Sequence, residues 1–272
     1  MYNWFGDSMG DFHFKKKYGQ NFLRDVNIVK KIVKTANITG NDLVIEVGPG
    51  RGILTKELSK ASLKVISYEI DSDLKNELLE VKNKYSNIDF VFEDFLKSNI
   101  STDIQNIKYE KLYFISNVPY YITTPILFKL IDSKLQFEKI IMMVQQEVGE
   151  RFCAKPGTKN YSSLTVYLNY FYDSRIEFEV KREEFIPVPN VDSCIVSFTR
   201  KNNRFPLTDS KVFYSLIRDS FKYKRKNLKN NLKNYDLEKI DKVLKKNGYS
   251  LTSRAEELPL SVFVEISNEL SL

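Results

Sequence analysis

The feature that most constrains the fold is an alternation of short apolar runs with amphipathic helical patterns between residues 25 and 145. The runs expected to form strands are 43–47, 64–68, 89–92, 112–116 and 139–144, and the helical patterns lie near 24–35, 53–60, 72–83 and 124–132. Continuous apolar runs separated by helices are typical of parallel strands that are buried on both faces. The sequence therefore predicts an α/β, Rossmann-like sheet flanked by helices.

The remainder of the chain follows a different pattern. Two further strands are expected at 176–180 and 193–199, joined through a proline-bearing loop as a hairpin at the sheet edge. After Arg200 the patterns are helical, near 209–220, 224–233, 236–247 and 260–270. A chain of 272 residues is long enough for one sizeable domain and a small appendage. We expect an N-terminal extension (1–14), a sheet domain (15–200) and a small all-helical domain (201–272).

A glycine-rich turn follows the first expected strand. Gly48, Gly50 and Gly52 come directly before a helical pattern. Glycines in this setting let the backbone approach a ligand and leave the helix N-terminus facing it. The dinucleotide fingerprint G-x-G-x-x-G would need glycine at position 53, which is Ile53. The spacing G-x-G-x-G, preceded by Glu46, is instead typical of S-adenosylmethionine sites, which hold no pyrophosphate.

Two carboxylates follow the next two strands. Glu69 ends the second strand, roughly 20 residues after the glycines, where an acid can accept both ribose hydroxyls of a cofactor. NAD and S-adenosylmethionine share that ribose, so Glu69 does not distinguish between them. Asp94 follows the third strand and could accept the adenine N6 of the cofactor, with Phe95 against its ring. The carboxyl ends of parallel strands share one edge, so these residues predict a single cofactor crevice.

The tetrad Asn117, Val118, Pro119 and Tyr120 ends the fourth apolar run. An exocyclic amino group of a base is a poor nucleophile because its lone pair is delocalised into the ring. A side-chain amide oxygen and a neighbouring backbone carbonyl can each accept one N–H and aim that lone pair at an electrophile. Pro119 would stiffen the turn and Tyr120 would stack on a flipped-out base. The alternative for this tetrad alone is an ordinary strand-end turn.

Positive charge is concentrated in one segment. The net charge is +7, and residues 201–236 alone hold ten Lys or Arg against three Asp, interleaved with Phe221, Tyr223 and Tyr235. Such a cluster indicates contact with a phosphate backbone, although a solvated helix face is the alternative. The candidate RNA-binding residues are Arg218, Lys222, Lys224, Arg225, Lys226 and Lys229.

The rest of the composition excludes several classes of protein. No apolar run approaches the roughly 18 residues that span a bilayer, and the first 14 residues do not have the pattern of a signal peptide. Cys153 and Cys194 are too few for a disulfide framework, which favours a cytoplasmic protein. His13 is the only histidine, which disfavours a histidine-based metal site or a Ser-His-Asp triad. We therefore expect no metal and no membrane partner.

Taken together, these motifs resemble the S-adenosylmethionine-dependent rRNA adenine-N6 dimethyltransferases over nearly the whole chain after residue 15. The matching segments are 17–23 (Lys-Tyr-Gly-Gln-Asn-Phe-Leu), 46–52, Glu69, Asp94, 117–120, 185–193 (Phe-Ile-Pro-Val-Pro-Asn-Val-Asp-Ser), the basic helix 221–232 and 254–258 (Arg-Ala-Glu-Glu-Leu). The resemblance implies a methyltransferase sheet over 15–200 and an RNA-binding helical domain over 201–272.

The resemblance also implies roles for individual residues. The implied cofactor contacts are Asn21, Leu23, Gly48, Gly50, Glu69, Asp94 and Asn117. Asn117 through its side chain and Val118 through its carbonyl would hold the target amino group, with the base between Tyr120 and Phe185. Methyl transfer would be direct and in line, twice per nucleotide, with proximity and orientation carrying most of the rate. No general base is assigned.

The family has two branches, and the motifs favour one of them. The small-subunit branch (16S rRNA, kasugamycin-sensitivity type) acts on two adjacent adenosines near the 3′ end, and the large-subunit branch (23S rRNA) confers macrolide resistance. The start at 18–23, the basic segment and the 254–258 motif resemble the small-subunit branch. Two positions depart from it: Val118 replaces leucine, and Lys224 replaces arginine, which loses a bidentate fork.

Three other functions are compatible with parts of the pattern. A ribosome-assembly factor could bind rRNA without catalysis. A nicotinamide-dependent dehydrogenase is disfavoured by Ile53 and by the tetrad at 117–120. A DNA adenine methyltransferase would leave the helical domain unexplained. The expected partner is small-subunit rRNA or a pre-assembled small subunit, and the protein is expected to be a monomer.

Overall fold

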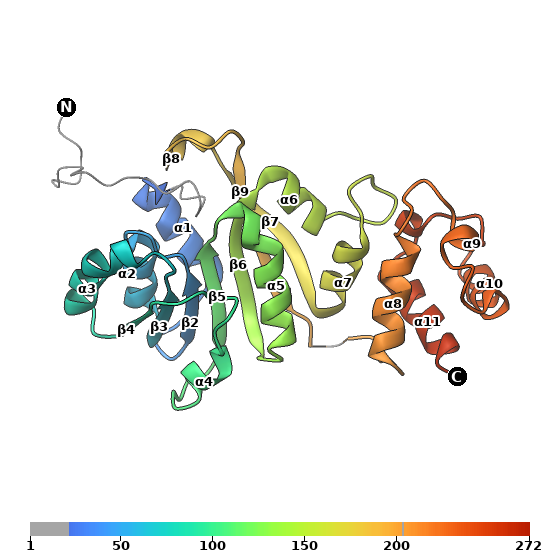
Figure 1. The fold of residues 1–272 in the computed structure, drawn as a ribbon, viewed down its shortest axis with the longest axis horizontal. Coiled ribbons are helices and arrows are strands. Elements are labelled where there is room, and N and C mark those ends of the chain that lie inside the picture. Colours follow the sequence, from blue (N-terminus) through green and yellow to red (C-terminus); the bar gives the residue numbers. More distant parts are fainter. Residues whose placement is uncertain (1–21, 203) are drawn as a thin grey trace.

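The computed structural model describes residues 22–202 and 204–272, and its centre is a seven-stranded sheet with the order β4-β3-β2-β5-β6-β9-β7 (Figure 1). Five strands are parallel: β2 (Leu43–Val47), β3 (Lys64–Tyr68), β4 (Ile88–Val91), β5 (Leu112–Asn117) and β6 (Phe137–Gln145). The predicted α/β class is thus confirmed. The strand expected at 89–92 begins one residue earlier, and the strand expected at 139–144 begins two residues earlier.

The last two strands form the predicted hairpin at the sheet edge. β9 (Ser193–Arg200) lies antiparallel between β6 and β7, and β7 (Tyr172–Val180) is the edge strand. Because β9 is antiparallel, it ends at the edge where the parallel strands begin. The chain therefore leaves the sheet at the edge opposite the carboxyl ends of the parallel strands.

Seven helices accompany the sheet. They are α1 (Val26–Ala36), α2 (Ile53–Ala61), α3 (Lys75–Lys84), α4 (Ile100–Ile104), α5 (Thr123–Asp132), α6 (Gln146–Phe152) and α7 (Ser163–Phe171). Alternate residues of β2 point to opposite faces, so Val44 packs with α1, α2 and α3, while Leu43 and Ile45 pack with α4 and α5. The central strands β2 and β5 are thus buried on both faces, which explains why they are mostly apolar.

Sequence patterns did not reveal α6 and α7. α7 carries Leu164, Val166, Leu168, Tyr170 and Phe171, so apolar side chains lie on every face and no amphipathic stripe is visible. The structure explains this composition, because Leu168 joins the sheet core while Val166 and Tyr170 join the core of the helices that follow. A capping box at Ser162 fixes the start of the helix.

The C-terminal region is helical, with α8 (Ser210–Ser220), α9 (Leu228–Asn231), α10 (Leu237–Lys246) and α11 (Leu260–Leu270). These helices enclose a third core that also takes Tyr161, Val166 and Tyr170 from the chain before residue 201. One expectation was wrong here: the helix predicted at 224–233 is only the single turn of α9, and the basic residues 222–226 lie in an irregular turn.

A small two-stranded element lies apart from the main sheet. β1 (Phe22–Leu23) pairs antiparallel with β8 (Phe185–Ile186), so that Phe22 lies opposite Ile186 and Leu23 opposite Phe185. The pair joins two segments that are far apart in the sequence. Some sequence predictions fall outside the described residues: the extension 1–14 and the 17–21 part of the N-terminal motif, which includes Asn21. In residues 22–202 and 204–272, no helix is long and apolar enough to cross a membrane.

Candidate active site

The candidate site lies where β2 and β5 separate at their carboxyl ends. β3 and β4 extend the sheet on one side of this pair and β6 on the other, so the strand order reverses here. Regular pairing of β2 with β5 stops at Ile45 and Phe114, and beyond it the Ser116 hydroxyl bonds to both the N–H and the carbonyl of Val47. Ligands of open α/β sheets bind at this reversal point.

The glycine turn closes one side of this crevice without presenting side chains. Gly48 and Gly50 have φ angles of +71° and +56°, which L side chains rarely adopt. A Cβ atom on Gly50 would lie 2.6 Å from the Phe22 ring, and one on Gly48 would lie 3.9 Å from the carbonyl oxygen of Asn117. The turn is therefore backbone packed closely against β1 on one side and beside the end of β5 on the other.

Glu46 supports the glycine turn from behind. Its carboxylate is buried and accepts hydrogen bonds from the hydroxyls of Thr55 at 2.7 Å and Ser67 at 2.8 Å, which ties β2 to α2 and β3. Burial raises the pKa of Glu46 from 4.5 to about 7, although both hydroxyls favour the charged form. Glu46 is thus a structural acid that holds the turn.

This buried acid predicts that the stability of the protein depends on pH. The native pKa lies above the unfolded value, so between pH 4.5 and 7 the native state binds more protons. The free energy of unfolding should therefore fall as pH rises through this window, by about 3 kcal/mol from this group. Urea titrations at pH 5 and pH 8 should show that Glu46→Gln, which keeps an acceptor, gains that amount relative to the wild type. An equal pH dependence in both proteins would contradict the assignment.

Two carboxylates line the crevice beyond the glycine turn. Glu69 is 5% exposed and accepts the backbone N–H of Asp71 at 2.8 Å. Burial raises its pKa, while backbone N–H groups of Asp71 and Gly50 act against that rise. Asp94 accepts the N–H of Leu96 at 3.0 Å and lies 3.8 Å from the Lys97 ammonium. Both acids are held by their own loops at the ends of β3 and β4.

The expected role of Phe95 needs correction. Its ring is 4% exposed and packs edge-on against Tyr68 with 5.1 Å between centroids, and against Phe114 at 6.0 Å. The ring therefore belongs to the sheet core and is not open to an adenine in this structure. The alternating burial after β4, with Asp94 outward and Phe95 inward, explains why adjacent residues have different roles.

The tetrad 117–120 is placed for contact with a ligand. Asn117 ends β5 opposite Met143, and among the described residues its side-chain amide has no hydrogen-bond partner. The Val118 side chain is 1% exposed and anchors the backbone at this point. The Tyr120 hydroxyl lies 2.7 Å from the hydroxyl of Ser193, and burial raises the pKa of Tyr120. The tetrad is thereby attached to the segment that follows the 185–192 loop.

Phe185 and Leu23 are not open to a ligand in this structure. Phe185 is fully buried and Leu23 is 7% exposed, both in the core formed with α1 and α2. The stacking role of Phe185 and the cofactor contact of Leu23 stay predictions. The loop that follows carries the exposed side chains of Val188 and Val191.

Comparisons with known proteins identify the family of this fold and site. The model of the ribosomal RNA adenine dimethylase family matches residues 11–272. The chain belongs to this family. The ribosomal RNA small subunit methyltransferase A of Ligilactobacillus salivarius is 42% identical, covering 94% of this chain and 90% of the relative. The protein of the same name from Geobacillus thermodenitrificans is 38% identical, covering 95% and 92%.

Solved structures agree with this assignment. A dimethyladenosine transferase from Plasmodium falciparum is 28% identical with a TM-score of 0.75, covering 90% of this chain and 95% of that one. The 23S rRNA methyltransferase ErmE is 26% identical with a TM-score of 0.74, covering 92% and 100%. Family membership confirms the recognition made from the sequence, the Rossmann-like methyltransferase fold and S-adenosylmethionine as the cofactor.

The residues of the crevice fit this cofactor. Gly48 and Gly50 present backbone without side chains, and Glu69 and Asp94 supply acceptors at successive strand ends. The amide of Asn117, which has no hydrogen-bond partner among the described residues, lies at the next strand end. The individual cofactor contacts remain predictions. Within the described part of the chain, no three His, Cys, Asp or Glu side chains come together as metal ligands.

Several basic residues of the C-terminal region lie in the turn between α8 and α9. Figure 1 shows the turn between α8 and α9 on the side where β8 lies, beside the connection from α6 to α7. The Lys224 ammonium donates to the carbonyl of Lys159 at 2.8 Å, which joins these two segments. Arg218 is already paired with Asp219 at 3.0 Å, so it is a weaker candidate for an RNA contact. Lys229 lies in α9.

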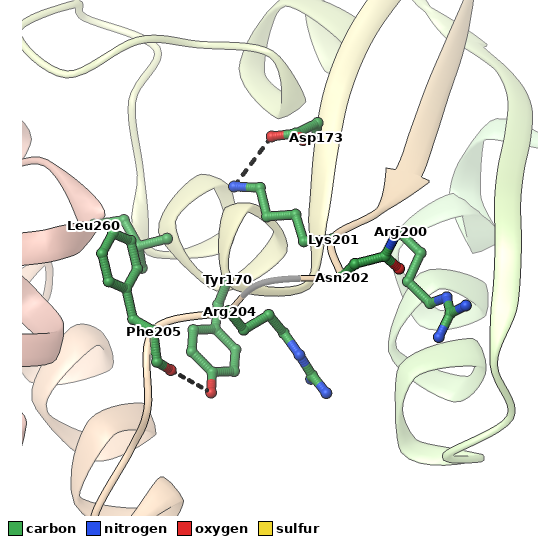
Figure 2. Close-up of a pocket in the computed structure, with 8 residues that line it drawn as sticks. All are labelled: Tyr170, Asp173, Arg200, Lys201, Asn202, Arg204, Phe205 and Leu260. Atoms are coloured by element: carbon green, nitrogen blue, oxygen red, sulfur yellow. Dashed lines mark hydrogen bonds and ion pairs between the residues drawn. The ribbon is translucent and has the colours of Figure 1, made fainter.

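A pocket at the opposite edge of the sheet contains none of the predicted site residues. Figure 2 shows it where the chain leaves β9, lined by Tyr170, Asp173, Arg200, Lys201, Asn202, Arg204, Phe205 and Leu260. The Lys201 ammonium is paired with Asp173 at 3.1 Å, and Arg200 lies 3.6 Å from Glu138. Two of its cations are therefore already paired with acids of the neighbouring strands β7 and β6.

Proposed function

We propose that this protein transfers methyl groups from S-adenosylmethionine to N6 of two adjacent adenosines near the 3′ end of small-subunit rRNA. Each adenosine would receive two methyl groups during ribosome biogenesis. The observation that carries the proposal is the amide of Asn117, which has no partner among the described residues and lies beside the glycine turn. An unpaired acceptor in a cofactor crevice is what a target amino group requires.

The chain's contribution to the reaction is orientation. The bound cofactor supplies a methyl group on an electrophilic sulfonium. Asn117 Oδ1 would accept one N–H of the adenine amino group and the carbonyl of Val118 the other, which draws the lone pair out of the ring. Pro119, with φ at −55°, holds the turn, and the buried Val118 side chain keeps its carbonyl in place. Correct positioning of reacting atoms contributes several kcal/mol to catalysis.

Tyr120 is the base-stacking residue that the structure supports most directly. Its hydroxyl is bound to Ser193, so the ring is held at one end while its face remains partly exposed. Ser193 begins β9 and is fully buried, which fixes the partner as well. A ring held in this way loses little conformational entropy when a base stacks on it.

The small-subunit substrate is favoured by the sequence relatives and not by the fold. ErmE is a 23S rRNA methyltransferase, yet its TM-score of 0.74 nearly equals the 0.75 of the dimethyladenosine transferase. The relatives that are about 40% identical over most of the chain carry the name small subunit methyltransferase A. The motifs at 18–23 and 254–258 point the same way. We also propose that the protein is monomeric and cytoplasmic.

The deciding experiment is methyl transfer from labelled S-adenosylmethionine to small and large ribosomal subunits that lack the modification. Nucleoside analysis of the small subunit should yield N6,N6-dimethyladenosine, with no label in the large subunit. Label in the large subunit would assign the protein to the resistance branch. Cofactor binding without label in either subunit would instead support a non-catalytic assembly factor.

RNA binding through the turn at 222–226 predicts a change in salt dependence. Replacing Lys224, Arg225 and Lys226 by alanine should lower the slope of log affinity against log salt concentration by about 2, at about 0.7 per lost contact with single-stranded RNA. The measurement is a filter-binding titration of an rRNA fragment between about 50 and about 300 mM salt, the range in which such slopes are usually determined. A Lys108/Lys111 double variant, at the opposite edge of the sheet, should keep the wild-type slope. An unchanged slope in the triple variant would exclude this turn from the interface.

A further inference from the structure

The basic turn between α8 and α9 has a defined shape because one side chain binds its backbone. The Asn231 amide nitrogen donates to the carbonyls of Ser220 at 2.7 Å, Tyr223 at 3.3 Å and Lys226 at 3.4 Å. The amide oxygen of Asn231 accepts the N–H of Tyr223 at 3.2 Å. These bonds satisfy backbone groups that a helix would otherwise pair, so residues 221–226 form a fixed turn.

Tyr223 is the residue that this arrangement holds most firmly. Its N–H is bound by Asn231, and its carbonyl accepts the N–H of Lys226 at 2.9 Å as well as the Asn231 amide. The side chain is nevertheless 53% exposed. The ammonium groups of Lys222 and Lys226 lie 5.6 and 5.7 Å from the centroid of its ring. A fixed backbone thus presents a half-exposed aromatic ring with the ammonium groups of two lysines near it.

Phe221 and Tyr235, the nearest aromatic residues on either side of Tyr223 in the sequence, have structural roles. Phe221 packs in the third core against Tyr161 and Phe263, at 6.1 and 5.9 Å between ring centroids. The Tyr235 hydroxyl donates to Asp219 at 2.8 Å. Neither ring needs a ligand to explain its position. Tyr223 differs, since about half of it is exposed and its two cation contacts are worth only about 1 kcal/mol each.

We infer that Tyr223 is a stacking site for an unpaired nucleobase of the RNA, with Lys222 and Lys226 contacting the flanking phosphates. An aromatic ring between cations is the usual arrangement for single-stranded nucleic acid, where each base offers a π-face and each linkage a negative charge. A fully paired helix would not fit, because its bases are stacked on each other. The inference rests on the proposed RNA substrate and adds to it a contact remote from the reacting base.

The position of Tyr223 is consistent with simultaneous binding at the crevice. The Lys224–Lys159 hydrogen bond joins the turn to the connection between α6 and α7, which lies on the same side as β8 in Figure 1. One RNA can therefore occupy the turn and the carboxyl edge of the sheet together. The stacked base would fix the register of the strand relative to the target adenosines.

The test compares Tyr223→Ala with Tyr223→Phe in binding to the unmethylated small subunit. Losing the ring should weaken binding about tenfold, which corresponds to about 1.4 kcal/mol, within the range for stacking of one base. Tyr223→Phe keeps the ring and should bind as the wild type does. Phe205→Ala removes an exposed ring at the opposite edge of the sheet and is the matched control, expected to leave affinity unchanged. Equal affinity of Tyr223→Ala and wild type would overturn the inference.

Two further measurements distinguish base stacking on Tyr223 from an effect on the neighbouring lysines. They also distinguish failure of this inference from failure of the proposed function. Tyr223→Ala should keep the wild-type salt slope, because no phosphate contact is lost, so a slope lowered as in the lysine variants would mean that Tyr223 only orients those lysines. RNA carrying 4-thiouridine in unpaired segments should crosslink to Tyr223, and crosslinks confined to other residues would contradict the site. If the wild type methylates the small subunit while Tyr223→Ala binds normally, only this inference fails.

Discussion

Asn117→Ala should reduce methyl transfer to the small subunit by about 100- to 1,000-fold while weakening S-adenosylmethionine binding only slightly. The amide of Asn117 is the acceptor that would orient the target nitrogen, and loss of one preorganised polar group at a reacting centre has effects of this size. The measurement is single-turnover methyl transfer at saturating cofactor, together with calorimetric titration of the cofactor. Turnover near the wild-type value would remove Asn117 from the reaction.

A matched control separates this effect from the loss of any amide. Asn99 caps α4, is exposed, and accepts the N–H of Thr102 at 3.4 Å, in the segment leading to the start of β5. Asn99→Ala should cost at most about 1 kcal/mol of stability and leave turnover unchanged. Asn117→Asp is informative as well, because it keeps an acceptor but places a negative charge beside the cofactor crevice. Partial activity is expected, between that of alanine and wild type.

The sheet and its crevice could be predicted because local patterns carried the information. β2, β3 and β5 are buried along most of their length and therefore appear as mostly apolar runs. The residues directly after such runs must lie at one edge, so Gly48, Glu69 and Asn117 could be placed together before any coordinates. Their convergence follows from parallel topology and needs no information on side-chain packing.

The features that local patterns missed mostly concern contacts between distant segments or local bonds that override helix propensity. The pairing of β1 with β8 has no local signal. Residues 222–226 have good helix formers, yet Asn231 binds their backbone and keeps them in a turn. α7 packs on two cores at once, so apolar residues lie on all its faces. Its helical period is therefore not visible in the sequence.

Glu69→Ala should weaken S-adenosylmethionine binding by about 100-fold or more. A buried carboxylate that accepts two ribose hydroxyls makes two charged hydrogen bonds, each worth about 1.5–3 kcal/mol. The variant also leaves the N–H of Asp71 without its present acceptor, which loosens the loop beside the glycine turn. Calorimetric titration measures the loss. Glu69→Gln keeps the volume and one acceptor, so it should fall between alanine and wild type. Unchanged affinity in Glu69→Ala would exclude the ribose contact.

Glu69→Ala and Asn117→Ala should respond differently to added cofactor. The difference tests which residue acts in cofactor binding and which acts in methyl transfer. If Glu69 only captures the cofactor, its contact is equally strong before and during methyl transfer, so saturating cofactor should restore turnover in Glu69→Ala. If Asn117 orients the target nitrogen, no cofactor concentration should restore Asn117→Ala. Restoration of both by excess cofactor would show that the strand end at Asn117 contributes to binding alone. Failure of Glu69→Ala at saturation would mean instead that the buried carboxylate also places the methyl group, through the glycine turn that it holds.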